Sequence, residues 1–171
     1  MNAMSIADFE KQLRGPYLFD WWLGRQRIST MLGLFSVEFQ MLGNGDTNPP
    51  DQEMLRRASE LVSYTEGHGQ FILDVVFGHY LLAAEDREWL DTCGVPQGLS
   101  PDRIADYLRE DRSLVISRNL AWDPPYASTI HIAPRWDEEH ALSLDFCDGT
   151  IAAVNDSPFT LEAGVLRWIE E

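Results

Sequence analysis

Alternation of apolar and polar residues predicts strands in the first and the last third of the chain. In the first third, Val37, Phe39 and Met41 alternate with polar residues within 34–41. This period of two is typical of a strand with one buried face. An aromatic-rich run over residues 17–23 predicts another strand before it.

The middle of the chain carries apolar residues at helical spacing. Two prolines and an aspartate within 48–51 form a helix start signal, and the apolar face that follows covers residues 54–65. Residues 71–83 follow the same period with apolar groups on a second side, so this helix is expected to be the most buried. A third helix is predicted from a Ser-Pro-Asp signal over residues 100–110.

The last third returns to strands. Candidates cover residues 113–118, 126–133 and 141–147, and each has apolar side chains at alternate positions. Asp148 and Gly149 then form one of the strongest short hairpin signals, which favours a type I′ turn.

The register of these hairpins can be predicted from the turn and the apolar pattern. The two-residue turn sets Leu144 opposite Ala153, and apolar matching across the earlier loop sets Ile130 opposite Leu144. Both hairpins then agree on the core face, although Val154 would lie on the polar face. That polar face would carry Thr129, His131, Ser143 and Asp145.

Together these elements predict an α+β fold, with an antiparallel sheet and about three central helices packed on one face. A single domain is expected over residues 1–171, since the chain is too short for two sizeable cores. A capping pattern predicts a short N-terminal helix over residues 5–14. The C-terminal element, residues 157–171, is either a closing helix capped by Ser157 or a strand over 165–169.

The charge of the chain excludes several function classes. Its net charge is −15, and residues 86–171 carry more of the acid, with 17 acidic and 7 basic residues. Such a field would repel nucleic acid and anionic membranes, so neither is expected as a partner. The sequence has neither an apolar membrane span nor a secretory signal, which predicts a cytoplasmic protein.

The cysteines and histidines predict neither a metal nor a cofactor. Cys93 and Cys147 lack the spacing of a metal site and are expected to be reduced thiols. His68 and His79 are expected to be a core or cap histidine each, and no phosphate-binding glycine loop is present.

The most distinctive segment is the run of residues 135–140. It combines an aromatic residue, three acids and a histidine, and its predicted contact residues for a partner are Trp136, Asp137, Glu138 and Glu139. A solvated hairpin loop, with the tryptophan folded onto the sheet, is the structural alternative. Divalent cation binding by the acids and the histidine is a third hypothesis, although consecutive residues on a loop seldom converge on one ion.

A catalytic reading rests on the predicted polar face of the sheet. His131, Ser143, Asp145 and Cys147 would share this face, which suggests a nucleophile, a base and an orienting acid. The candidate catalytic residues are His131, His140 and Asp145. No nucleophile elbow of the GxSxG type is present, so a hydrolase is the alternative and not the leading hypothesis.

The segment from Trp136 to His140 resembles one found in a bacterial family of uncharacterised domains. Members of that family are acidic and carry a C-terminal hairpin with the pattern Trp-Asp-x-Glu-His-Gly; here Ala141 replaces the glycine. The resemblance covers residues 16–155 and implies a fold more than a function. Some small acidic bacterial domains act as immunity proteins beside toxins, which is an analogy at the level of the fold.

These observations lead to three hypotheses. The first is a non-enzymatic protein-binding module, in particular an immunity-type inhibitor of a basic toxin or nuclease. The second is a metal-dependent or His/Asp/Cys hydrolase. The third is a domain that associates with itself and so covers an exposed strand edge.

Overall fold

The computed structural model describes residues 13–17, 21–30, 32–42, 48–137, 141–155, 159–162 and 165–168. The strands of its main sheet are β1 (Leu13–Tyr17), β2 (Trp21–Thr30), β3 (Gly33–Met41), β4 (Ser113–Arg118), β5 (Tyr126–Ile132), β6 (Leu142–Cys147) and β7 (Thr150–Asn155). The helices are α2 (Gln52–Gly67), α3 (Gly69–Ala83), α4 (Arg87–Thr92) and the 3-10 helix η1 (Pro101–Tyr107). A separate pair is formed by β8 (Phe159–Glu162) and β9 (Val165–Trp168).

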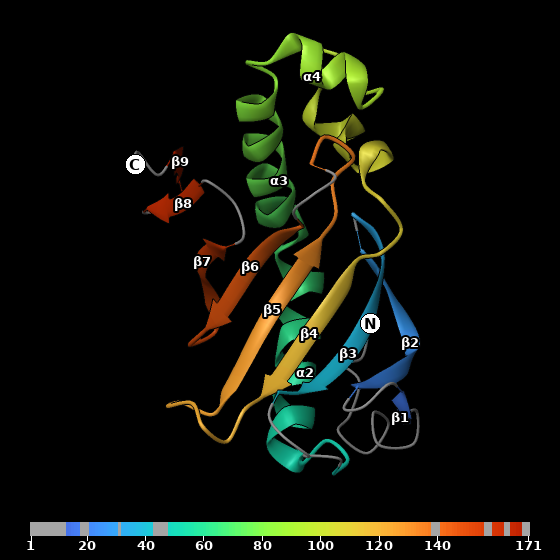
Figure 1. Ribbon diagram of the computed structural model, residues 1–171, viewed down its shortest axis with the longest axis vertical. Helices are drawn as coiled ribbons and strands as arrows, with labels where there is room; N and C mark the ends of the chain where they lie inside the picture. Colours follow the sequence, from blue (N-terminus) through green and yellow to red (C-terminus); the bar gives the residue numbers. More distant parts are fainter. Residues whose placement is uncertain are drawn as a thin grey trace.

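The seven strands follow one another across the main sheet in chain order (Figure 1). Every neighbouring pair is antiparallel except β3 and β4, which run parallel. A mixed α and β fold is therefore confirmed, whereas the prediction of a purely antiparallel sheet is wrong at this pair. Between β3 and β4 the chain passes through all four described helices, and such a long crossover allows a strand to return in the same direction.

One face of the sheet carries much of the core. Val37, Leu114, Ile130 and Leu144 lie in a single row across β3, β4, β5 and β6, and all four are buried. The predicted pairing of Ile130 with Leu144 is confirmed. The other face carries the polar pairs that the register predicted, which are His131 with Ser143 and Thr129 with Asp145.

The hairpin of β6 and β7 departs from the predicted register after its first two pairs. Its turn is as expected, with positive φ at Asp148 (50°) and Gly149 (81°). A β-bulge then shifts the pairing, so that Leu144 lies opposite Val154 and not opposite Ala153. The shift turns Val154 onto the core face, where it is buried. The bulge therefore removes the misfit that the regular register left at this residue.

Helix α2 contacts β4 and β5, and Figure 1 shows it behind the strands of the sheet. Its predicted apolar face is confirmed, because Met54, Ala58, Leu61 and Thr65 are all buried. Helix α3 extends past the end of the sheet, and α4 lies beyond it (Figure 1). The structure therefore does not place all of the helices over the sheet.

The observed elements differ from the predicted ones at three places. The helix expected over 100–110 is the 3-10 helix η1, since the chain after it is extended and Leu108 forms a bridge with Pro134. Helix α4 was not predicted at all. The strand expected over 17–23 is divided between β1 and β2.

At the N-terminus, most of the predicted helix over 5–14 lies outside the described residues, and Leu13 and Arg14 belong to β1. At the C-terminus, residues 165–168 form β9. For these four residues the strand alternative is confirmed over the closing helix.

Asp51 joins the start of α2 to the sheet. Its Oδ1 accepts a hydrogen bond from the Met54 backbone N–H at 2.9 Å, which caps the helix. Its Oδ2 accepts hydrogen bonds from Arg118 Nη1 at 2.7 Å and from the Tyr126 hydroxyl at 2.9 Å. Burial acts to raise the pKa of Asp51, but these hydrogen bonds outweigh it and hold the pKa below its usual value.

We expect Asp51→Ala to lower the free energy of unfolding by about 3 kcal/mol, because it removes a cap and leaves Arg118, 7% exposed, without its carboxylate. The matched control is Asp86→Ala, since Asp86 caps α4 by accepting from Trp89 N–H and should cost only about 1 kcal/mol. Urea denaturation at pH 7 measures both. Equal losses would contradict a role for the ion pair. The pair's contribution is present above the usual aspartate pKa and should be lost as the pH falls through the lowered pKa of Asp51.

Candidate partner-binding site

Trp136, a predicted contact residue, lies in the core and not on the surface. Its side chain is 1% exposed, and its ring meets that of Tyr80 edge to face at a centroid distance of 5.6 Å. Its indole Nε1 donates a hydrogen bond to Nδ1 of His79 at 2.8 Å. The prediction that Trp136 anchors a partner is therefore wrong for this structure, because burying the ring and pairing its N–H stabilise the protein itself.

His79 is a buried, neutral histidine. Because its Nδ1 accepts from the indole, the ring proton is on Nε2, which faces Oδ2 of Asp137 at 3.8 Å. Burial lowers the pKa of His79 to about 4, although the charge of Asp137 acts in the opposite direction. The expectation of a core histidine is confirmed, and a cap position is confirmed for His68, which ends α2.

Trp89 fixes α4 beside this cluster. Its indole Nε1 donates to the backbone carbonyl of Trp136 at 2.6 Å, while its ring remains 39% exposed. Tyr80 fixes the segment after α4 in a similar way, because its hydroxyl donates to the Pro96 carbonyl and accepts from the Leu99 N–H. Four side chains, those of His79, Tyr80, Trp89 and Trp136, thus connect α3, α4 and the loop after β5.

A cavity of about 590 Å³ opens at this junction. His79, Trp89 and Trp136 are among its lining residues. The polar residues around it are mostly acidic, and these are Glu85, Asp86, Glu88 and Asp137, with one arginine, Arg87. A cavity lined by both apolar and acidic side chains is suited to a partner surface that presents an apolar group among basic ones.

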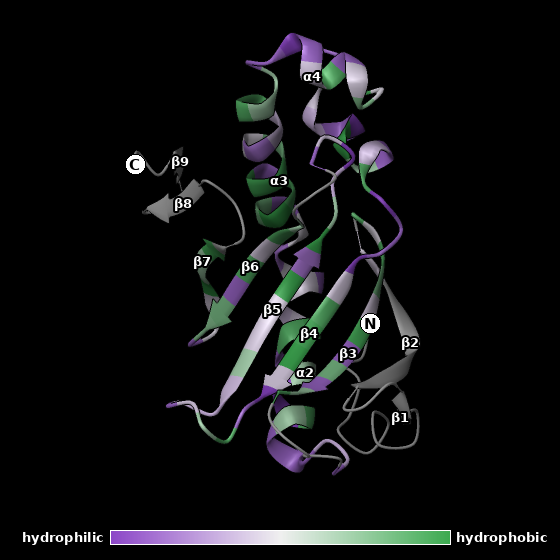
Figure 2. Ribbon diagram, in the orientation of Figure 1, coloured by the Kyte–Doolittle hydropathy of each residue, from purple (hydrophilic) through white to green (hydrophobic). Residues whose placement is uncertain are grey.

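The whole end of the molecule around α4 is acidic. Residues 85–111 contain eight acidic and three basic residues, and all eight acids are exposed. Figure 2 shows hydrophilic residues along α4 and the segments beside it, beyond the end of the sheet. We call this region, residues 85–111 with the cavity, the acidic end.

Of the other predicted contact residues, the structure describes Asp137, which lies beside the acidic end. Asp137 lines the cavity and is partly exposed, so its role as a contact stays a prediction. Glu138, Glu139 and His140 lie outside the described residues. Sequence reasoning missed Trp89 and the acids around α4, although the run from Glu85 to Glu88 next to a tryptophan carries the same signal as the segment it selected.

Of the predicted catalytic residues, the structure describes His131 and Asp145, which lie on one sheet face. His131 lies opposite Ser143, and Asp145 accepts a hydrogen bond from Thr129 at 3.3 Å. Sequence reasoning missed Glu38 on this face. Burial raises the pKa of Glu38, while hydrogen bonds from Ser36 and Ser113 and the charge of His131 partly offset this rise.

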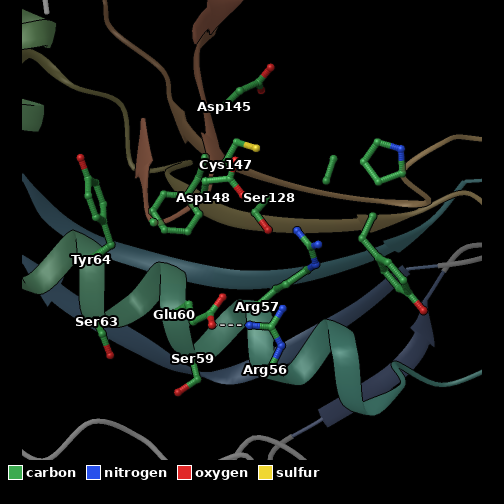
Figure 3. A pocket seen from close by; sticks show the side chains of 15 residues that line it. Arg56, Arg57, Ser59, Glu60, Ser63, Tyr64, Ser128, Asp145, Cys147 and Asp148 are labelled. Atoms are coloured by element: carbon green, nitrogen blue, oxygen red, sulfur yellow. Dashed lines mark hydrogen bonds and ion pairs between the residues drawn. The ribbon is translucent and has the colours of Figure 1, made fainter. Parts of the chain in front are cut away.

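A second cavity, the α2 cleft, lies between α2 and the ends of β5 and β6, with a volume of about 900 Å³ (Figure 3). Arg56, Arg57, Ser128 and Cys147 are among its lining residues. Both cysteines are free, as expected, with Cys147 exposed and Cys93 half-buried near the end of α4.

Within the described part of the chain, no three histidine, cysteine, aspartate or glutamate residues are grouped to hold a metal ion. None of the helices described is long and apolar enough to cross a membrane. Comparison with protein-family models, curated proteins and solved structures finds no match to this chain. A functional interpretation therefore depends on the geometry, and the resemblance to a bacterial family stays a prediction.

The state of His79 predicts a pH dependence of stability. Between pH 6.5 and about 4 the unfolded chain binds a proton at this histidine that the folded protein does not. Burial of the neutral His79 ring therefore contributes fully to the free energy of unfolding above pH 6.5. This contribution, about 3 kcal/mol, is lost as the pH falls to about 4.

We expect His79→Asn to remove this pH-dependent part of the free energy of unfolding. An asparagine carbonyl oxygen still accepts a hydrogen bond from the Trp136 indole but does not titrate. Urea denaturation of both proteins at pH values from 7.5 to 4 measures it. The unfolding free energy of the variant should decline less steeply over this range. Parallel declines would show that His79 is not held neutral.

Proposed function

We propose that this protein is a non-enzymatic binding module that recognises a basic protein through its acidic end. The observation that carries the proposal is the set of eight exposed acids over residues 85–111, three of which, Glu85, Asp86 and Glu88, line a cavity beside the partly exposed Trp89. Charged residues around an interface raise the association rate and exclude wrong partners. A tryptophan beside an apolar cavity provides the kind of contact from which interfaces draw most of their binding energy.

The geometry around α4 favours a preformed surface. Trp89 is fixed by its hydrogen bond to the Trp136 carbonyl, and α4 is capped by Asp86. A partner would therefore not have to order this segment on binding, which lowers the entropic cost of association. The narrower form of the proposal is an immunity-type inhibitor, which would cover the active site of a basic toxin or nuclease.

The hydrolase alternative has no comparable support. Of its candidate residues, His131 and Asp145 lie on one sheet face, where Asp145 accepts a hydrogen bond from Thr129, and His140 lies outside the described residues. Neither His131 nor Asp145 lines the cavity at the acidic end.

The proposal is tested with two triple variants of equal charge change. The first, Glu85→Lys/Glu88→Lys/Asp91→Lys, reverses acids at the acidic end and leaves the Asp86 cap in place. The control reverses three exposed acids elsewhere, Glu66→Lys/Asp74→Lys/Asp123→Lys. Each protein is immobilised and exposed to a lysate of the cells that produce it, then eluted with a salt gradient.

We expect the wild type and the control variant to retain one basic protein in near-stoichiometric amount, and the acidic-end variant to lose it. With the purified partner, the association rate should fall steeply with salt for the wild type and only weakly for the acidic-end variant. Equal retention by both variants, or no basic protein in repeated trials, would contradict the proposal. Light scattering over a dilution series separates it from self-association.

A further inference from the structure

The α2 cleft lies far from the acidic end and differs from it in chemistry. In Figure 1, α4 lies at the top of the molecule, the start of α2 lies at the bottom, and the turn between β6 and β7 lies at the left near the middle. One wall of the cleft is α2, with Arg56 and Arg57, and the other is formed by the ends of β5 and β6. The cleft therefore presents two arginines in a chain whose net charge is −15.

Arg57 has donors left for a ligand. Its Nε donates to Glu53 at 2.8 Å, and its guanidinium lies over the Tyr126 ring, 5.5 Å from the ring centroid. Among the described residues, neither Nη atom of Arg57 has a hydrogen-bond partner. A guanidinium that is held in place and has both Nη groups unused is suited to bidentate binding of a carboxylate.

Ser128 is the second feature of the cleft that points to a ligand. Its side chain is 3% exposed, yet its hydroxyl has no hydrogen-bond partner in the described part of the chain. The residue lies on the core face, opposite Ile116, where an apolar side chain would be expected. Figure 3 shows the Ser128 hydroxyl and the Arg57 guanidinium pointing toward one another from the two walls. An unpaired buried hydroxyl is costly, which requires an explanation.

Three acids line the cleft, which are Glu60, Asp145 and Asp148, and Asp148 lies in the exposed turn after β6. Glu53 and Glu60 are both bound to Arg56, and Glu53 is bound to Arg57 as well. Figure 3 shows the Asp145 carboxylate directed away from α2. Tyr64 and Phe146, whose ring centroids are 4.9 Å apart, provide an apolar surface beside these polar groups.

We propose that the α2 cleft binds a small aromatic carboxylate, with the carboxylate on Arg57 and the ring toward Tyr64 and Phe146. Arg57 provides the first contact. The Ser128 oxygen is covered in this structure, so it donates to the carboxylate only after neighbouring side chains shift, and it contributes less. This site is independent of the partner proposed for the acidic end.

Benzoate is the probe, and benzamide is its neutral isostere. The exposed Cys147 lines the cleft and reports occupancy through its rate of alkylation by iodoacetamide, followed by mass spectrometry. Cys93, near the end of α4, is the internal reference in the same molecule. We expect benzoate to slow the alkylation of Cys147 in a saturable way and to leave Cys93 unchanged. Benzamide should protect neither cysteine.

Variants assign the binding groups. Arg57→Gln should weaken benzoate binding about tenfold or more, since it removes a charge-assisted pair of hydrogen bonds. Ser128→Ala should weaken it about threefold. The matched control is Arg103→Gln, an exposed arginine paired with Asp106 three residues along, which should bind like the wild type. Arg57→Lys keeps the charge without the planar fork and should also bind more weakly than the wild type.

Three results would overturn the proposal. They are equal protection by benzamide and benzoate, protection of Cys93 together with Cys147, and unchanged affinity in Arg57→Gln. Thermal unfolding of each variant shows whether it is folded. If Arg57→Gln is unfolded, the affinity of Arg57→Lys for benzoate replaces it as the test.

Discussion

The burial of Trp136 is the constraint on which the acidic end depends. Its indole N–H binds His79, its ring packs against Tyr80, and its carbonyl accepts from Trp89. Trp136, in the loop after β5, is therefore in contact with both α3 and α4. Helices of six and seven residues, such as α4 and η1, are not stable alone, so contacts of this kind hold them in place. His79 accepts this hydrogen bond only while its Nδ1 is unprotonated, which ties the arrangement to the neutral imidazole.

The eight exposed acids of the acidic end lie away from the sheet. Like charges repel one another, and this repulsion destabilises a compact state in proportion to their density. Here eight exposed acids occupy short elements and loops beyond the sheet, while the core rows of β3–β6 consist mainly of apolar side chains. The sheet and α2 are stabilised by these rows and by Asp51, which caps the N-terminal end of α2 and binds Arg118 and Tyr126. The charge that the proposed recognition uses is thus carried by short elements, although their buried residues Leu90 and Ile104 belong to the same hydrophobic core as the sheet.

The local pattern was sufficient to predict the strands, the two long helices and most of the hairpin register. These elements follow from the apolar period and the turn type, which are properties of neighbouring residues. The bulge beside Val154, the parallel pair β3 and β4, and the burial of Trp136 each depend on contacts between distant segments. The candidate site shows the same division. An aromatic residue among acids was recognised over 135–140, but only the structure brings it beside Trp89 and places its tryptophan in the core.

The two candidate sites illustrate how one acidic chain can present opposite chemistries. At the acidic end, α4 and η1 contribute exposed carboxylates that few basic residues offset. On α2, Glu53 and Glu60 are instead engaged by Arg56 and Arg57, so the acids there neutralise arginines and add little field of their own. Because exposed charges are screened over about 8 Å at physiological salt, the acidic end should hardly weaken the anion binding proposed for the α2 cleft. Local pairing, and not the net charge of −15, therefore decides what each surface attracts.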